Sequence, residues 1–263
     1  MKTIKKYFQG IWRDKYILWS FVNKDLQMKY RRSVLGVAWS ILTPLGLVII
    51  IGSVYSIIFN VDPKIFIPSL FAGLNPWIFI NVSADGGAFA FISAEGYLKQ
   101  TEVNAQIFPV RTVLVGFINL LYSVLAFFAV YLFLQPHLFG IKMLMVIPGL
   151  IIMFFFGLSL SNISAVLNLN IRDFQPLQSL VLQGLFYATP IIFDASMLAE
   201  KGFALVYEIN PIYYIIEVVR TPLLGNVLPP IHIYVVAISI TFLLFIVSII
   251  LVMKCKKSIV FKL

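Results

Sequence analysis

The chain has 263 residues, of which 60% are hydrophobic and 12% are charged, and its mean hydropathy is +0.96. Soluble domains are about 45–50% apolar and about 25% charged, so this composition argues against a soluble protein. The net charge of +9 is explained by membrane topology and by contact with anionic headgroups, and does not indicate nucleic-acid binding. We predict an all-α polytopic membrane protein that forms one domain over residues 1–263.

Residues 1–32 combine apolar and basic side chains at near-helical spacing. The apolar positions are Ile4, Phe8, Ile11, Trp12, Trp19 and Val22. A helix of this kind lies in the membrane interface with its apolar face in the acyl boundary. We therefore expect a cytoplasmic amphipathic interface helix. The alternative is a disordered basic leader that only sets topology, but two Trp and several aliphatic residues exceed what topology requires.

Residues 33–263 form the predicted six-span core. The expected spans are Val34–Phe59, Ser69–Ala94, Val110–Leu134, Met143–Leu167, Leu177–Phe193 and Ile233–Met253. Four of the 20 Lys and Arg residues fall on one side of this arrangement, namely Lys64, Lys142, Lys201 and Arg220, and the others fall on the opposite side. Because basic residues concentrate on the cytoplasmic side, both termini are expected there.

Two spans carry distinctive residues. Asp85 lies near the cytoplasmic end of the second span, and an intramembrane carboxylate is a functional candidate. A solvated or helix-capping role is at least as well supported, and without a second intramembrane acid proton coupling is disfavoured. In the fourth span Gly157, Ser161 and Ala165 recur every four residues, which lets another helix approach closely. Packing within the subunit is the preferred interpretation.

The chain has no sequence signature of a nucleotide or metal site. It contains neither GxxxxGK[ST] nor a Gly-Lys dipeptide, so no P-loop binds ATP here. His137 and His232 are far apart in the sequence and have no Cys ligands nearby, so no metal site is expected. We predict no catalytic residue and no cofactor in this chain.

A polar-to-apolar segment follows the fifth span on the outer side. Asn210 suits a helix N-cap, Pro211 the first helical position and Gly225 the C-terminal stop, and Arg220 can pair with Glu217. The fifth span has only about seventeen residues, which is short for a bilayer core of about 30 Å. We therefore expect a pair of short helices between spans five and six that re-enter the outer leaflet.

Four segments of the chain resemble the ABC-2 type permeases that export polysaccharides. They are YRRSVLGVAWSILTPL within Lys24–Gly46, FAGLNPWIFI at Phe71–Ile80, SAEGYLKQTEVNAQIFPVRTV after the second span, and NPIYYIIEVVRTPLLGN after the fifth. Each motif alone is weak, but their order and spacing across six spans make the match specific. The sequence Asp85-Gly86-Gly87 departs from the family pattern.

The resemblance implies a transmembrane subunit of an O-antigen, capsule or teichoic-acid ABC exporter in the bacterial cytoplasmic (inner) membrane. Two copies of the chain would pair with two cytoplasmic ATPase subunits, and those subunits would bind ATP and Mg. The substrate would be an undecaprenyl-type lipid-linked glycan, of which O-antigen-like chains are the nearest match.

The resemblance also implies roles for two groups of residues. The connection after the second span resembles the coupling helix that docks on the ATPase, with Glu95, Tyr97, Leu98, Lys99 and Gln100 as its contact residues. The helix after the fifth span lies beside the pore exit in the family. Its predicted outer-gate residues are Asn210, Pro211, Tyr213, Tyr214 and Arg220.

Two further sets concern the substrate. Lys29, Arg31 and Arg32 lie at headgroup depth, where guanidinium groups can bind the lipid diphosphate bidentately. Simple anchoring to anionic lipid is an equal alternative. Sugars favour aromatic surfaces, so the predicted channel-lining residues are Tyr55, Phe59, Phe186, Tyr187 and Phe193. Packing against lipid is the competing interpretation for each ring.

Two other functional classes remain open. A drug or small-lipid ABC-2 exporter shares the fold but usually lacks this basic amphipathic leader. An integral-membrane lipid-modifying enzyme would need clustered His, Asp or Glu within the spans, and the sequence offers only Asp85.

Overall fold

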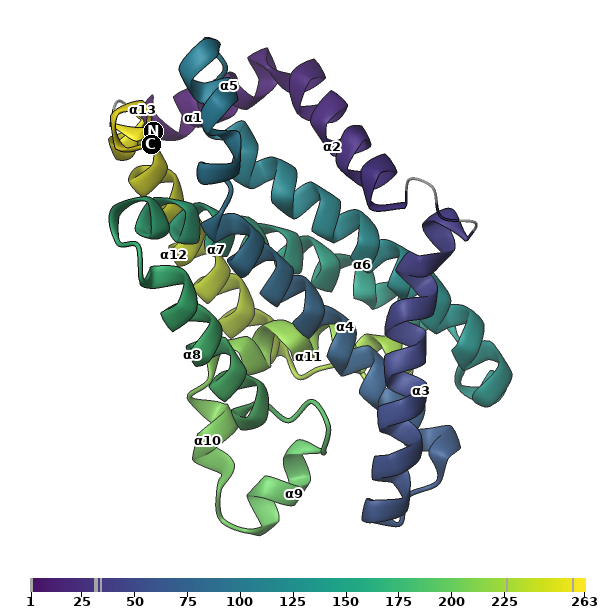
Figure 1. The fold of residues 1–263 in the computed structure, drawn as a ribbon. Helices are drawn as coiled ribbons and strands as arrows, with labels where there is room; N and C mark the ends of the chain where they lie inside the picture. The colour runs from purple at the N-terminus through teal and green to yellow at the C-terminus, as the bar shows by residue number, and fades with distance from the viewer. Residues whose placement is uncertain (1, 31–32, 34, 226, 257) are drawn as a thin grey trace.

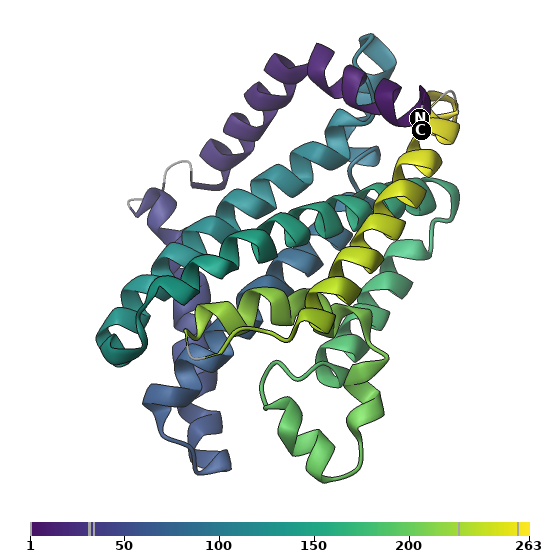
Figure 2. The same cartoon turned by 180° about the vertical axis from the view of Figure 1, so that it is seen from behind.

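A computed structural model describes residues 2–30, 33, 35–225, 227–256 and 258–263, and its described elements are helices (Figure 1). The first and last helices, α1 (Lys2–Arg13) and α13 (Ile259–Lys262), lie at the same end of the bundle, together with α5 (Glu95–Gln100). We call this the terminal end. The opposite end carries α9 (Ala195–Glu200) and α10 (Ala204–Glu208), as both views show (Figures 1 and 2).

Five described helices are long and apolar enough to cross a membrane. They are α3 (Trp39–Phe59), α4 (Pro63–Ala88), α6 (Ile107–Leu134), α7 (Val146–Asn170) with the preceding 3-10 turn η4 (Ile141–Met145), and α12 (Ile231–Cys255). The predicted fifth span corresponds to α8 (Phe174–Ala188), which has 15 residues. At 1.5 Å per residue α8 covers about 22 Å, less than the roughly 30 Å of a bilayer core.

The second span starts and ends six residues earlier than predicted, because its N-terminus is capped at Asp62. Asp62 accepts a hydrogen bond from the backbone N–H of Lys64 at 2.9 Å, and Pro63 occupies the first helical position, so α4 starts before Ser69. The helix ends at Ala88, and the turn η2 (Ile92–Ala94) leads into α5. The first span starts at Trp39, after the turn η1 (Gly36–Ala38), whereas its predicted start at Val34 lies outside the described residues.

The centre of the bundle is the close contact between α4 and α7. A Cβ atom on Gly87 would lie 2.5 Å from the Cα of Ser161, and one on Gly157 would lie 2.6 Å from the ring of Phe79. Only glycine permits this approach of two helices. The small residues of α7 therefore pack within the subunit, as predicted, and Gly87 is the α4 residue that allows this contact.

The first span contacts its neighbours through a narrow seam. Its buried residues are Ser40, Pro44, Val48, Gly52 and Ser56, one in every four positions. Its other faces expose large apolar side chains, including Ile50 and Ile57. Because so little of α3 is covered within one chain, most of this helix is available to lipid or to another protein chain.

The predicted interface helix is two helices, α1 and α2 (Lys15–Tyr30), that meet at Asp14. The side that faces the bundle carries Tyr7, Asp14, Leu18 and Val22, which are all buried. The predicted apolar face divides accordingly: Val22 is buried and Ile4 and Ile11 are half-buried, whereas the rings at positions 8, 12 and 19 are exposed. The segment thus packs on the bundle with a side that includes Asp14, and it exposes aromatic rings on the other side.

Between α8 and α12, the helix α11 (Pro211–Leu223) crosses the bundle and packs against α4, α7 and α12 (Figure 2). Asn210 caps it by accepting a hydrogen bond from the N–H of Ile212 at 3.0 Å. Gly225 follows the helix with a φ of +72°, a left-handed conformation that suits glycine. The predicted start and stop of this helix are confirmed.

Candidate functional site

A groove with polar and aromatic walls lies between α4 and α8. In Figure 1, α8 and α3 stand on either side of α4. The groove contains a cavity of about 380 Å³, lined by Leu74, Trp77, Ile78, Asn81, Ser179, Gln183, Phe186 and Tyr187. Amide and hydroxyl groups are rare inside apolar bundles and mark polar pathways. We take this groove as the candidate functional site.

The chemistry of the groove changes along its length. Towards the terminal end, Asp85 accepts hydrogen bonds at its Oδ1 atom from Ser179 Oγ at 2.8 Å and from Gln178 Nε2 at 3.4 Å. Further along, the ring centroids of Trp77 and Phe186 lie 5.4 Å apart. The groove therefore offers hydrogen-bonding groups at one end and flat apolar rings at the other.

Two of the five predicted lining residues, Phe186 and Tyr187, line this groove. Phe186 and Tyr187 belong to the α8 wall, with ring centroids 5.3 Å apart, and Tyr187 is 66% exposed. The rings of Tyr55 and Phe59 on α3 lie 5.7 Å apart and are tilted relative to each other. Phe193 is half-buried in the irregular segment after α8. The structure brings the α8 pair to the groove, while the α3 pair packs towards Phe66 of α4.

The polar residues of this groove were not among the predicted site residues. Gln175, Gln178, Ser179 and Gln183 recur on one face of α8, and Asn81 faces them from α4. The available signal was their helical spacing within an otherwise apolar span. Only the partner helix reveals that this face meets Asp85 and Asn81 rather than lipid.

The predicted coupling residues form the short helix α5. Leu98 is buried and fixes the helix to the bundle, whereas Tyr97, Lys99 and Gln100 are exposed. Lys99 pairs with Glu95 at 2.6 Å, one turn away. The ring of Tyr97 lies 4.9 Å from that of Phe21, so α5 is also in contact with α2.

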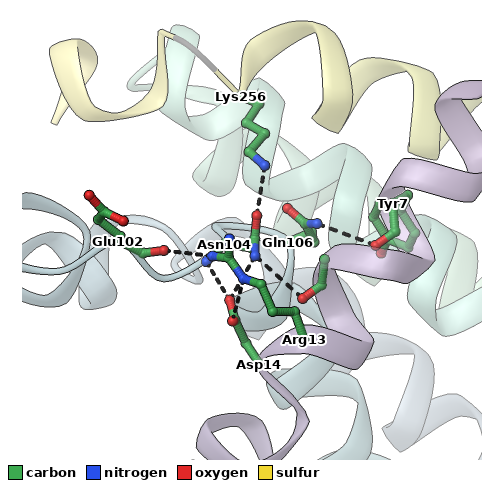
Figure 3. A network of polar contacts seen from close by, with 8 residues as sticks. Tyr7, Arg13, Asp14, Glu102, Asn104, Gln106 and Lys256 are labelled. Atoms are coloured by element: carbon green, nitrogen blue, oxygen red, sulfur yellow. Dashed lines mark hydrogen bonds and ion pairs between the residues drawn. The ribbon is translucent and has the colours of Figure 1, made fainter.

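A polar network ties α1 to the segment that follows α5 (Figure 3). Asp14 Oδ2 accepts hydrogen bonds from the backbone N–H of Asn104 at 2.7 Å and from its side-chain amide at 2.8 Å. Lys256, at the end of the last span, donates to Asn104 Oδ1 at 2.7 Å. Burial raises the pKa of Asp14, but the hydrogen bonds from Asn104 and Arg13 outweigh it, so the pKa lies below its ordinary value.

Two more contacts extend this network. Arg13 donates to the carbonyl oxygen of Glu102 at 2.8 Å, and Gln106 donates to that of Tyr7 at 3.3 Å (Figure 3). A bidentate ion pair between Arg111 and Asp25 joins α6 to α2. The whole connection between α4 and α6 is thus fastened to the two N-terminal helices.

The predicted diphosphate entrance is only partly described. Lys29 belongs to the last turn of α2, and Arg31 and Arg32 lie outside the described residues. The described chain resumes shortly before α3, where the indole N–H of Trp39 donates to Ser33 Oγ at 3.1 Å.

At the opposite end, Arg220 is the central residue of the predicted outer gate. Its side chain is 6% exposed and donates to the carbonyl oxygen of Pro190 at 2.5 Å and to Ser69 Oγ at 2.9 Å. It also pairs with Asp194 at 3.2 Å and, as predicted, with Glu217 at 3.5 Å. Arg220 therefore holds α11 against α4 and the segment after α8.

The two gate tyrosines lie beside this cluster. The rings of Tyr213 and Tyr214 are 5.3 Å apart, and the Tyr214 hydroxyl donates to the carbonyl oxygen of Glu208 at 2.7 Å. Asn210 and Pro211 start the same helix. Among the described residues, no three His, Cys, Asp or Glu side chains gather in a way that could hold a metal ion.

Known proteins are similar to this chain over most of its length. Residues 16–224 match the family described as "ABC-2 type transporter". Two proteins named O-antigen export system permease protein RfbA, both from Klebsiella pneumoniae, are 31% and 30% identical to this chain over 219 residues, which is 81% of either chain. A protein of the same name from Myxococcus xanthus is 28% identical over 76% of this chain and 77% of its own length. The chain belongs to the ABC-2 type transporter family.

Proposed function

We propose that this chain is the transmembrane subunit of an ABC transporter that exports a lipid-linked, O-antigen-like polysaccharide. The observation that carries the proposal is the groove between α4 and α8. A sugar chain presents hydroxyl groups and flat apolar faces, and the groove offers amide and hydroxyl groups next to Trp77 and Phe186. An exporter of drugs or small lipids would have less use for so polar a wall. The names of the similar permeases support the same reading.

In this proposal the protein lies in the bacterial inner membrane with its terminal end in the cytoplasm. The short helix α8 is the sixth membrane element, and α11 is a re-entrant helix in the outer leaflet. The packing of α11 against three long helices supports this. Backbone at membrane depth must form its hydrogen bonds within the protein, as a helix does. Its residues Asn210, Pro211, Tyr213, Tyr214 and Arg220 then gate the exit.

Two copies of the chain work with two cytoplasmic ATPase subunits, which hold ATP and Mg. The exposed apolar faces of α3 suit contact with the second copy. The exposed residues of α5 suit contact with an ATPase. Because the chain carries no P-loop, the energy for export comes from the partner.

The basic junction of Lys29, Arg31 and Arg32 receives the diphosphate of the lipid carrier. Replacing Arg31 and Arg32 by Ala should reduce export, and Lys should restore only part of it, because an ammonium makes no bidentate contact. Complete rescue by Lys would assign the junction to simple headgroup anchoring.

Reconstitution tests the whole function. The chain and its ATPase are co-expressed, placed in proteoliposomes and supplied with an undecaprenyl-diphosphate oligosaccharide. We expect ATP-dependent movement of the glycan across the membrane, and none without the ATPase. A complex that hydrolyses ATP but moves a fluorescent drug or phospholipid instead of the glycan would overturn the proposal.

A further inference from the structure

Asp85 lies beside the groove, although it is not one of the residues that line the cavity. It lies one helical turn from Asn81 on α4, and Ser179, which donates to it, also lines the cavity. Asp85 is half-buried rather than solvent-exposed. Asp85 lies three residues before the end of α4, and even a half-buried carboxylate is costly unless it has a partner or a task.

The partners of Asp85 leave part of it unused. Ser179 and Gln178 both donate to Oδ1, and no other described residue donates to Oδ2. None of the ion pairs among the described residues includes Asp85, whereas Asp14, Asp25 and Asp194 each have an arginine. Asp85 therefore presents a free acceptor oxygen and an uncompensated negative charge beside the groove.

These properties select between classes of sugar. A carboxylate oxygen accepts hydrogen bonds from sugar hydroxyl groups or from the ammonium of an amino sugar. It repels the carboxylate of an acidic sugar, and repulsion is strong where little water screens it. The cavity beside Asp85 is lined by Asn81, Ser179 and Gln183, whose amide and hydroxyl groups can bind the hydroxyl groups of a sugar.

We propose that Asp85, with Ser179, Asn81 and Gln183, forms a sugar-binding subsite that passes neutral or amino-sugar glycans and discriminates against acidic ones. This inference rests on the proposed function and adds to it the class of glycan. The competing interpretation is that Asp85 only ties α8 to α4. A structural tie would affect all substrates alike, so the ratio between two substrates separates the two interpretations.

The experiment uses the complete complex with its ATPase in proteoliposomes. Two undecaprenyl-diphosphate tetrasaccharides serve as probes, identical except that one carries a uronic acid. For the unmodified protein we expect the neutral probe to move at least about tenfold faster. Asp85→Asn should bring the ratio close to one, Asp85→Glu should retain it, and Asp85→Lys should reverse it. The matched control is Asp173→Asn, an exposed carboxylate just before α8, which should leave the ratio unchanged.

Three results would overturn the inference. They are equal transport of both probes by the unmodified protein, equal changes for Asp85→Asn and Asp173→Asn, and a parallel loss of both probes in Asp85→Asn with the ratio preserved. ATP-dependent movement of neither probe by the unmodified protein would overturn the proposed function itself, and this inference with it.

Discussion

Asn104 makes two hydrogen bonds to the same carboxylate oxygen of Asp14, a residue 90 positions earlier in the chain, at 2.7 and 2.8 Å. Through this contact the N-terminal helices are held to the segment directly behind α5. Lys256 adds the end of the last span to the same amide. A displacement of α5 by a partner must therefore move α1, or break a buried network (Figure 3).

Removing the Asn104 side chain should loosen this network. Asn104→Ala leaves the buried Asp14 and the exposed Lys256 with one fewer partner each, and the loss at Asp14 costs about 1–3 kcal/mol. We expect earlier proteolysis between α1 and α2 and weaker coupling of ATP hydrolysis to export. Glu102→Ala is the control, because only the backbone carbonyl of Glu102 bonds to Arg13. Equal effects of both substitutions would contradict the role of the Asn104 side chain.

The lowered pKa of Asp14 predicts a specific pH dependence. Because the folded pKa lies below the unfolded value of about 3.9, the stabilisation is fully present above pH 3.9 and is lost as pH falls through the folded pKa. Hydrogen exchange in α1 should be constant from pH 7 to about pH 5, after correction for the intrinsic rate, and increase in more acidic buffer. Asp14→Asn should remove most of this change. A transition in α1 centred near pH 6 would point to another group.

Close packing at Gly87 predicts a severe effect of a small substitution. Gly87→Ala places a Cβ atom 2.5 Å from the backbone of Ser161, which cannot move without displacing α7. We expect a loss of at least about 2 kcal/mol of stability, measured as a lower thermal transition in detergent. Gly184→Ala in α8 is the control, since a Cβ there meets no atom within 4 Å. That substitution should be neutral or stabilise by up to about 1 kcal/mol.

Replacing Arg220 should lower the stability of the protein. Arg220→Met removes the partner of Ser69 and of the Pro190 carbonyl and leaves the half-buried Glu217 without its cation. Breaking such a buried pair costs about 3–5 kcal/mol. Arg220→Lys should recover only part of this, because one ammonium cannot reach all of these groups. Detachment of α11 can be followed by labelling of a cysteine at Ile216, which is buried in the intact protein. Full protection of that cysteine in the Arg220→Met variant would contradict this role.

Much of the fold could be read from hydropathy and end signals, because a bilayer demands long apolar helices and helix ends demand caps. Four of the five long helices correspond closely to predicted spans. The start of α11 was predictable from Asn210 and Pro211, and the pair of Glu217 and Arg220 from their spacing. These features depend on residues close together in the chain.

The candidate site depended on contacts that no local pattern encodes. The polar face of α8 could have pointed to lipid, to α7 or to α4, and only the packed bundle sets Ser179 against Asp85. The same holds for Asn104 and Asp14, and for the division of the N-terminal aromatics between a buried and an exposed side. In each case the energy comes from pairing groups on different helices, so the partner is decided by tertiary packing and not by periodicity.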